Sequence, residues 1–179
     1  NVSVGLASIY NSYTTTAYDN GYYLTHTLDK IALNSDVTFV LAAGNENKKG
    51  VAFPLMAYNA ISVGNTDDKN TADVADDALN KTSSYYNVLT PTYASKPDIC
   101  APGTLININD SNATYMGSNL TYEGIKKYAK TTGTSLSAPH VAGCIALLFE
   151  QKPMLMYSPE IAKAIITAGV FTSTHCYVP

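Results

Sequence analysis

Charged residues are scarce in this sequence. Only 14% of the 179 residues are Asp, Glu, Lys or Arg, and the formal net charge is −3. Surfaces that bind nucleic acid carry clustered Lys and Arg, so this composition argues against a nucleic-acid partner. Apolar residues make up 46% of the chain, which is enough for a buried core and too much for global disorder. We expect one domain over residues 1–179.

Long apolar runs are lacking as well. The longest candidate, Cys144–Phe149, is far shorter than the roughly 18 residues that a membrane-spanning helix needs. The chain opens at Asn1 without a signal-peptide pattern, and Asn1–Gly5 already has the pattern of a short strand. We therefore expect no membrane span and a chain that starts inside a fold.

Cysteines are few, and their spacing matches no metal site. Cys100, Cys144 and Cys176 are odd in number, which argues against a full disulfide framework. Free cysteine is usually a small buried residue, so we expect Cys100 and Cys144 to be buried. Cys176 lies in the C-terminal tail, where no pattern assigns it a role.

Strand-like and helix-like segments alternate along the chain. Patterns typical of strands cover Asn1–Gly5, Val37–Ala43, Ala60–Gly64 and Pro97–Pro102. The spacing of apolar residues predicts helices over Asn20–Asn34, Thr134–Gln151 and Pro159–Ala168. Ser158 stands in the N-cap position of the last helix, and Gly169 can end it. Strands that alternate with helices predict an α/β fold with a mostly parallel sheet.

Two polar segments interrupt this alternation. Asn65–Ser84 contains a cluster of aspartates: Asp67, Asp68, Asp73, Asp76 and Asp77. A solvated loop is one interpretation of this cluster. A calcium site is the other, because hard cations bind clustered carboxylates, although no EF-hand spacing is present. Ser111–Lys130 is polar and irregular, and we expect an insertion there with a short helix around Tyr122–Tyr128.

The strongest chemical signal is the run Gly133–Gly143, with the sequence GTSLSAPHVAG. Ser135 stands at the start of a predicted helix, where free N–H groups and the helix dipole favour negative charge. A hydroxyl that attacks a carbonyl creates an oxyanion, which needs such an environment. Gly133 would allow a tight turn before Ser135, and Pro139 would fall near the end of the first turn. An ordinary N-capping serine is the alternative.

This run resembles the active-site serine segment of subtilisin-like serine proteases (subtilases), although Leu136 and Ser137 stand where the family usually has Met and Ala. Other segments match the family in its order: Asn1–Gly5, Leu41–Glu46, Phe53-Pro54, Ala60–Gly64 and Pro97–Gly103. The resemblance spans roughly residues 1 to 170. It implies a three-layer subtilisin-like α/β fold with a mostly parallel sheet, of which only the C-terminal half is present.

The resemblance also implies a role for each matching residue. Ser135 would be the nucleophile, and the side-chain amide of Asn45 would stabilise the oxyanion together with the Ser135 N–H. The residues that would bind an extended substrate are Ser3, Val4, Gly5, Ala42, Ala43, Gly44 and Thr134. Taken alone, Gly44-Asn45 after a buried strand is a turn, at the sheet edge where α/β folds place ligands.

A serine nucleophile needs a base and an orienting carboxylate. The Asp and His motifs of the family do not occur in this sequence. His140 follows Ser135 by five residues, a net rotation of roughly 140° around the helix, so it cannot accept the Ser135 proton. In the family the matching histidine is structural. His26 and His175 stand in no matching motif, so we expect the base and the carboxylate before Asn1.

The sequence therefore predicts part of a serine endopeptidase that works through an acyl-enzyme, and an isolated chain that is inactive. A catalytically dead peptide-binding or scaffold pseudoprotease is the alternative, and a self-contained hydrolase that uses His26 or His175 is the third. The expected partners are a peptide or protein substrate and the missing N-terminal half of the domain. A homodimer would also cover the exposed edge of a divided sheet. The family implies a secreted or cell-surface location.

Overall fold

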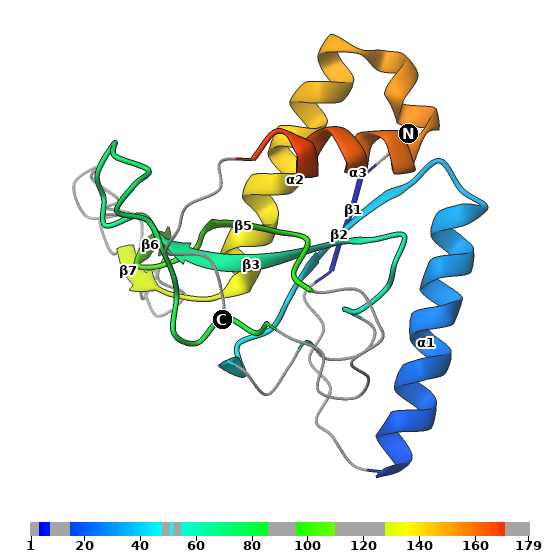
Figure 1. Ribbon diagram of the computed structural model, residues 1–179, viewed down its shortest axis with the longest axis horizontal. Helices are drawn as coiled ribbons and strands as arrows, with labels where there is room; N and C mark the ends of the chain where they lie inside the picture. Colours follow the sequence, from blue (N-terminus) through cyan, green and yellow to red (C-terminus); the bar gives the residue numbers. More distant parts are fainter. Residues whose placement is uncertain are drawn as a thin grey trace, which may run out of the picture.

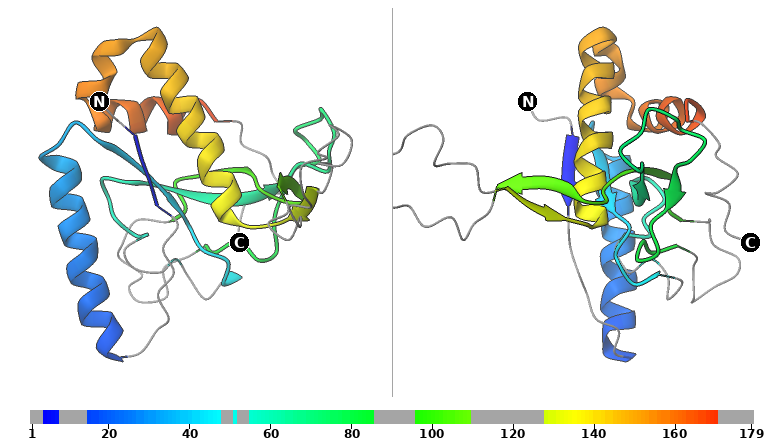
Figure 2. Two further views of the ribbon diagram at one scale, coloured as in Figure 1. Left: turned by 180° about the vertical axis from the view of Figure 1, so that it is seen from behind. Right: turned by 90° about the vertical axis from the view of Figure 1, so that its left-hand side faces the viewer.

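The computed structural model describes residues 4–7, 15–47, 51, 55–85, 96–109 and 128–170. Within these ranges a central sheet carries helices on both faces (Figures 1 and 2). The strands are β1 (Val4–Ala7), β2 (Thr38–Ala42), β3 (Ile61–Asp67), β4 (Ala78–Leu79), β5 (Ile99–Pro102), β6 (Ile106–Asn109) and β7 (Tyr128–Thr131). The helices are α1 (Thr15–Leu33), α2 (Thr134–Gln151), the 3-10 helix η2 (Pro153–Tyr157) and α3 (Pro159–Ala168).

The main sheet confirms the predicted α/β fold. Its parallel strands lie in the order β1-β2-β3-β5, and β4 pairs with the end of β3 in the antiparallel sense. Parallel neighbours need a crossover connection, which α1 supplies between β1 and β2. The predicted strands recur with shifted ends, and the first of them moves from Asn1–Gly5 to Val4–Ala7.

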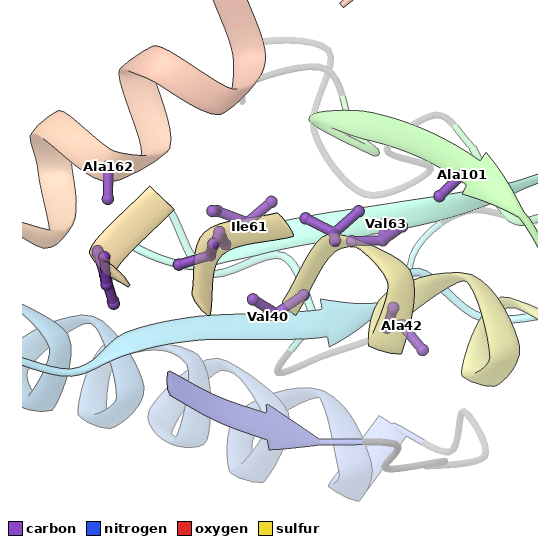
Figure 3. Close-up of a cluster of buried hydrophobic side chains, with 10 residues drawn as sticks. Val40, Ala42, Ile61, Val63, Ala101 and Ala162 are labelled. Carbon is purple, nitrogen blue, oxygen red and sulfur yellow. The ribbon is translucent and has the colours of Figure 1, made fainter. Parts of the chain in front are cut away.

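Side chains of β2 alternate between two cores. Val40 and Ala42 belong to the core under α2 and α3, whereas Leu41 and Ala43 belong to the core on the α1 side. Figure 3 shows Val40 and Ala42 on the same side of the sheet as Ile61 of β3, beneath α2. Neighbouring strand residues point to opposite faces, so a sheet covered on both sides needs apolar residues at consecutive positions. That is why the segment around β2 is almost wholly apolar.

The helix α2 buries one stripe of its surface against the sheet. The buried apolar residues of the stripe recur three or four positions apart, at Ala138, Val141, Ile145 and Phe149. Among the 18 residues of this helix, only Glu150 is charged. Leu147, on the outer face, is nevertheless 63% exposed to solvent. A helix that is apolar nearly all round is typical of a buried position. The outer face of α2 thus lacks, within the described residues, the cover that its sequence predicts.

The prediction that Cys100 and Cys144 are buried is not met at either position. Cys144 is exposed, and Cys100 is half-buried. Cys144 precedes the buried Ile145 by one residue, which rotates it about 100° away from the buried stripe of α2. Burial was predicted from residue type alone, and the position on the helix decided otherwise. Cys176 lies outside the described residues.

Other differences concern the ends of elements and one hairpin. The helix α1 begins at Thr15 and not at Asn20. The strands β6 and β7 form an antiparallel pair that includes Tyr128, so the predicted helix around Tyr122–Tyr128 is wrong at its last residue. Residues 122–127 lie outside the described ranges. The bounds of α3 are confirmed, although Ser158 makes no side-chain cap bond and Gly169 has an ordinary φ of −88°.

The acidic segment after β3 uses its carboxylates locally. Asp67 and Asp73 accept hydrogen bonds from the backbone N–H groups two residues later, at 3.1 and 2.9 Å. Such bonds stabilise turns. Among the residues that the structure describes, no three His, Cys, Asp or Glu side chains gather where they could hold a metal ion. Over the same ranges, no helix combines the length and the hydrophobicity needed to cross a bilayer.

Candidate active site

Asn45 lies just beyond the carboxyl end of β2, at the edge of the sheet where α/β proteins bind ligands. The chain leaves the strand through Ala43, whose N–H donates to the carbonyl of Val63 at 2.8 Å. Gly44 then takes a φ of +105°, a conformation that favours glycine. This turn carries Asn45 out of the sheet, and its side chain is exposed.

The side-chain amide of Asn45 is oriented by Thr134. The backbone N–H of Thr134 donates to Asn45 Oδ1 at 3.0 Å, and the Thr134 hydroxyl donates to the same oxygen at 3.3 Å. The Thr134 hydroxyl also accepts the N–H of Gly44 at 3.1 Å. A backbone N–H can only donate, so the amide atom that faces Thr134 must be the oxygen. Asn45 Nδ2 therefore faces away from Thr134, where it can donate a hydrogen bond to a ligand.

Ser135 follows Thr134 directly and is the second residue of α2. The Leu136 N–H reaches back to the Gly133 carbonyl at 3.0 Å, and the Gly133 N–H donates to the Gly103 carbonyl at 2.9 Å. These bonds anchor the start of the helix to the end of β5. The first N–H groups of a helix have no acceptor within it, and the dipole makes this end positive. The exposed Ser135 thus lies at an end that favours an anion.

Two expectations about this segment were wrong. Gly133 has a φ of 168° and a ψ of 156°, an extended conformation that any residue adopts. A Cβ at Gly133 would meet the Asn45 amide only at 3.5 Å, so no tight glycine turn places Ser135. Pro139 is the sixth residue of α2 and lies beyond its first turn. Proline has no N–H to offer the Ser135 carbonyl four residues earlier.

Gly103 is the position near Ser135 where a side chain does not fit. A Cβ on Gly103 would overlap Ser137 Oγ and would lie 2.7 Å from Asn65 Oδ1 and 2.8 Å from the Gly133 carbonyl oxygen. The segment after β5 therefore approaches the start of α2 through bare backbone. This close approach fixes the helix that carries Ser135 against the sheet.

We expect Gly103→Ala to lower the free energy of unfolding by roughly 1–3 kcal/mol, the usual cost of overpacking. One of the three clashing atoms is a backbone oxygen, so a rotamer change cannot relieve the contact. Gly143→Ala is the matched control, because a Cβ on Gly143 meets nothing within 4 Å. Helix propensity predicts a gain of about 0.5–1 kcal/mol there. Urea unfolding of the 179-residue chain measures the free energy of unfolding of both variants. If Gly103→Ala were as stable as Gly143→Ala, the close contact at Gly103 would be contradicted.

The candidate substrate-binding residues around Asn45 are largely buried, and only Gly44 is partly accessible. Ala42 is 4% exposed, and Ala43 and Thr134 are fully buried. These values include the backbone, so the three residues are almost wholly closed to a ligand, whereas Gly44 is half-buried. Gly44 has no side chain. Recognition at this point would therefore be of the main-chain kind, by hydrogen bonds to an extended peptide.

The candidates on β1 lie further from Asn45. Val4 and Gly5 pair with residues near the start of β2, whereas Ala7 pairs with Leu41 near its end. Ala7 is therefore the residue of β1 nearest the Asn45 end of the sheet. Ser3 lies outside the described residues.

The described histidines are not placed to act on Ser135. His140 Nδ1 lies 2.8 Å from the Leu136 carbonyl oxygen, so its ring contacts the backbone of its own helix. His26 lies on α1, which covers the opposite face of the sheet from α2 (Figure 2). His175 lies outside the described residues. The expectation that His140 is structural agrees with this geometry.

Sequence reasoning missed Ser84, which contacts the segment that carries Asn45, and several buried polar residues near it in sequence or on β3. Ser83 and Ser84 fall in the segment interpreted as a solvated loop, yet they are 0% and 1% exposed. Asn65 and Thr66, at the start of that segment, are buried within β3. Polar residues that become buried through hydrogen bonds leave no apolar period, so no pattern in the sequence indicated them.

Known proteins are similar in sequence to this chain. The model of the Subtilase family matches residues 1–173. Serine protease AprX of Bacillus subtilis (strain 168) is 32% identical over 143 residues, which cover 77% of this chain and 31% of that protein. Subtilisin BL of Lederbergia lenta is 33% identical over 122 residues, which cover 68% of this chain and 35% of that protein. The chain spans about a third of the length of these relatives.

A solved structure shares the fold. A cold-adapted subtilisin-like serine proteinase superposes with a TM-score of 0.56 at 22% identity, over 91% of this chain and 47% of that one. The α/β arrangement is thus part of the subtilisin-like fold. An asparagine beyond β2, oriented by the residue before a serine at the start of α2, lies within the matched region. The chain belongs to the subtilase family of serine proteases.

Proposed function

We propose that this chain supplies the nucleophile and the oxyanion hole of a serine endopeptidase. The observation that carries the proposal is the bond from the Thr134 N–H to Asn45 Oδ1, which presents Nδ2 as a donor beside the start of α2. Ser135 Oγ attacks the scissile carbonyl, and Asn45 Nδ2 and the Ser135 N–H stabilise the oxyanion. The amine then leaves, and water hydrolyses the acyl-enzyme.

We assign the base and its carboxylate to the N-terminal half of the domain. Ser135 needs both groups to lose its proton, and the described histidines do not supply the base. The outer face of α2 favours a docked partner, because Leu147 is 63% exposed on a helix that carries a single charged residue, Glu150. The solved proteinase named above is about twice as long as the part matched here. The two halves would complete one active site.

A catalytically dead peptide-binding scaffold is the second candidate. The observation that favours it is the contact of His140 with its own helix. Neither of the described histidines can therefore act as the general base for Ser135. A peptide would still bind along β1 by main-chain hydrogen bonds. We favour the peptidase, because the oriented Asn45 amide occurs together with a serine at the start of a helix, in a chain that matches a protease family. A secreted or cell-surface location is proposed on the family alone.

Supplying the N-terminal half tests the proposal. The 179-residue chain alone is expected to leave a chromogenic peptide amide uncleaved, and a protein extended by the sequence encoded before Asn1 is expected to cleave it. Ser135→Ala in the extended protein should lower kcat about 10⁶-fold, the loss measured in subtilisin for its nucleophile. Cleavage that survives Ser135→Ala would overturn the assignment. Peptide binding without cleavage would identify the scaffold.

Mixing the 179-residue chain with the N-terminal half as a separate polypeptide tests which surface of the chain binds that half. Leu147→Arg on α2 is expected to prevent assembly, whereas Leu33→Arg, at a leucine 76% exposed on α1, should not. Both leucines are exposed, so neither change should unfold the chain. Light scattering reports the assembly. A homodimer of the chain that Leu147→Arg dissociates would identify a second copy, and not the N-terminal half, as the occupant of this face.

A further inference from the structure

Ser84 holds the backbone on both sides of Asn45. Its N–H donates to the Gly44 carbonyl at 2.8 Å, and its Oγ accepts the N–H of Glu46 at 2.9 Å. Ser84 is 1% exposed, so water does not compete for these bonds. The residues before and after the candidate oxyanion donor are thus bound to one buried serine from a segment 38 positions away.

Backbone bonds extend this pairing. The Asn47 N–H donates to the Thr82 carbonyl at 3.0 Å, and the Tyr85 N–H donates to the Asn47 carbonyl at 3.3 Å. These four hydrogen bonds join residues 44–47 to residues 82–85. Among them, only the bond from the Glu46 N–H to Ser84 Oγ involves a side chain. A single substitution can therefore remove it and leave the backbone pairing in place. Packing is close here too, since a Cβ on Gly44 would meet Ser84 Oγ at 3.1 Å.

An oxyanion donor acts only from the correct position. The donor must lie about 2.7–3.1 Å from the developing charge, and a misplacement of roughly 1 Å can cost 10² in rate. Thr134 orients the Asn45 amide, but the exposed segment that carries Asn45 needs a second anchor. We propose that Ser84 is a positioning residue that fixes the backbone of Asn45 for oxyanion binding. This inference rests on the proposed peptidase function.

Ser83 provides a matched control. It is fully buried, like Ser84, and its Oγ also accepts a backbone N–H, that of Asn65 at 2.9 Å. The bond joins the loop after β4 to β3 and does not touch the residues that flank Asn45. Ser83→Ala therefore removes the same kind of group from the neighbouring position.

Kinetics of the extended protein, with both halves of the domain, test the inference. We expect Ser84→Ala to lower kcat about tenfold with KM unchanged, and Ser83→Ala to leave both within about twofold. In an Asn45→Ala background, Ser84→Ala should have no further effect, because positioning acts only through the Asn45 amide. An additive loss in the double variant, or an equal loss from Ser83→Ala, would show a purely structural role and overturn the proposal.

Amide hydrogen exchange in the 179-residue chain tests the contact without catalysis. Ser84→Ala should speed exchange of the Glu46 amide about tenfold, and Ser83→Ala should leave that amide unchanged. Unchanged exchange in Ser84→Ala would overturn the contact. If the contact holds but the extended protein cleaves no peptide, the peptidase function is wrong. If the protein is active and Ser84→Ala keeps the wild-type kcat, the positioning role is wrong and the peptidase function stands.

Discussion

Asn45→Ala in the extended protein is expected to lower kcat by about 10²–10³, with KM little changed. The magnitude is the one measured for the oxyanion-hole asparagine of subtilisin itself and is taken over from it. The structural reason is the orientation of the amide: Thr134 binds the oxygen, so Nδ2 is the atom left to stabilise the oxyanion. Alanine removes that donor and leaves the Ser135 N–H to act alone. An interaction made mainly in the transition state lowers kcat and not binding.

Steady-state kinetics on a peptide amide measure this effect. Asn34→Ala is the control, because Asn34 is also an exposed asparagine, just after α1, and its amide donates to the Lys30 carbonyl. It should leave kcat unchanged. Thermal unfolding should show that Asn45→Ala remains folded, since the side chain is exposed. A kcat within about threefold of the wild type would exclude Asn45 from the oxyanion hole.

The second large effect concerns stability. Asp98→Asn is expected to lower the free energy of unfolding by about 3–5 kcal/mol at pH 7, the usual result of breaking a buried ion pair. Asp98 Oδ2 lies 2.6 Å from Lys96 Nζ, and Asp98 Oδ1 lies 3.0 Å from Lys163 Nζ. The Lys96 side chain is 2% exposed, so its charge would lose its counter-ion where water cannot replace it.

The same carboxylate joins three parts of the fold. Asp98 accepts the N–H of Ser62 on β3 at 2.8 Å. Lys96 and Lys163 both donate to the Ala60 carbonyl, at 3.3 and 2.9 Å, just before β3. Lys163 belongs to α3, so the cluster links that helix to the entry of β3 and to the start of β5. Its loss should loosen the packing of α3 as well as the ion pair.

The pH dependence follows from Lys96. Burial lowers the pKa of Lys96 to about 8, with Asp98 opposing the shift and Lys163 adding to it. In the unfolded chain the pKa of Lys96 stays near 10.5. Between about pH 8 and pH 10.5 the unfolded state therefore binds more protons than the native state. Lys96 thus makes the free energy of unfolding rise with pH over this range. A neutral Lys96 has less need of a carboxylate. The deficit of Asp98→Asn should therefore shrink from pH 7 to pH 9.5, as urea unfolding at both values can measure.

A surface pair provides the control for burial. Lys69 Nζ lies 2.8 Å from Asp67 Oδ2, but the two side chains are 46% and 29% exposed. Exposed pairs contribute little, so Asp67→Asn should cost less than about 1 kcal/mol. If Asp67→Asn cost as much as Asp98→Asn, or if the Asp98→Asn deficit did not change with pH, burial of Lys96 would not be the cause.

Much of the fold could be predicted because its signals are local. The apolar run around β2 and the apolar spacing of α2 are properties of consecutive residues, and the bounds Thr134–Gln151 were predicted as found. The paired strands β6 and β7 were missed because their signals are short: β6 alternates over only four residues, ININ, and β7, YAKT, has no second apolar residue beyond Ala129 to extend its pattern. Ser83 and Ser84 were missed because hydrogen bonds, and not hydrophobicity, explain their burial.

The sequence by itself determined that Ser135 stands at the start of a helix and that His140 is rotated away from it, because helix geometry depends on spacing alone. Only the tertiary structure decided which amide atom of Asn45 faces outward, since Thr134 lies 89 residues away. It also decided that Gly103, and not Gly133, tolerates no side chain, and that Cys144 is exposed. These properties depend on which distant segments meet, and a local pattern carries no record of such contacts.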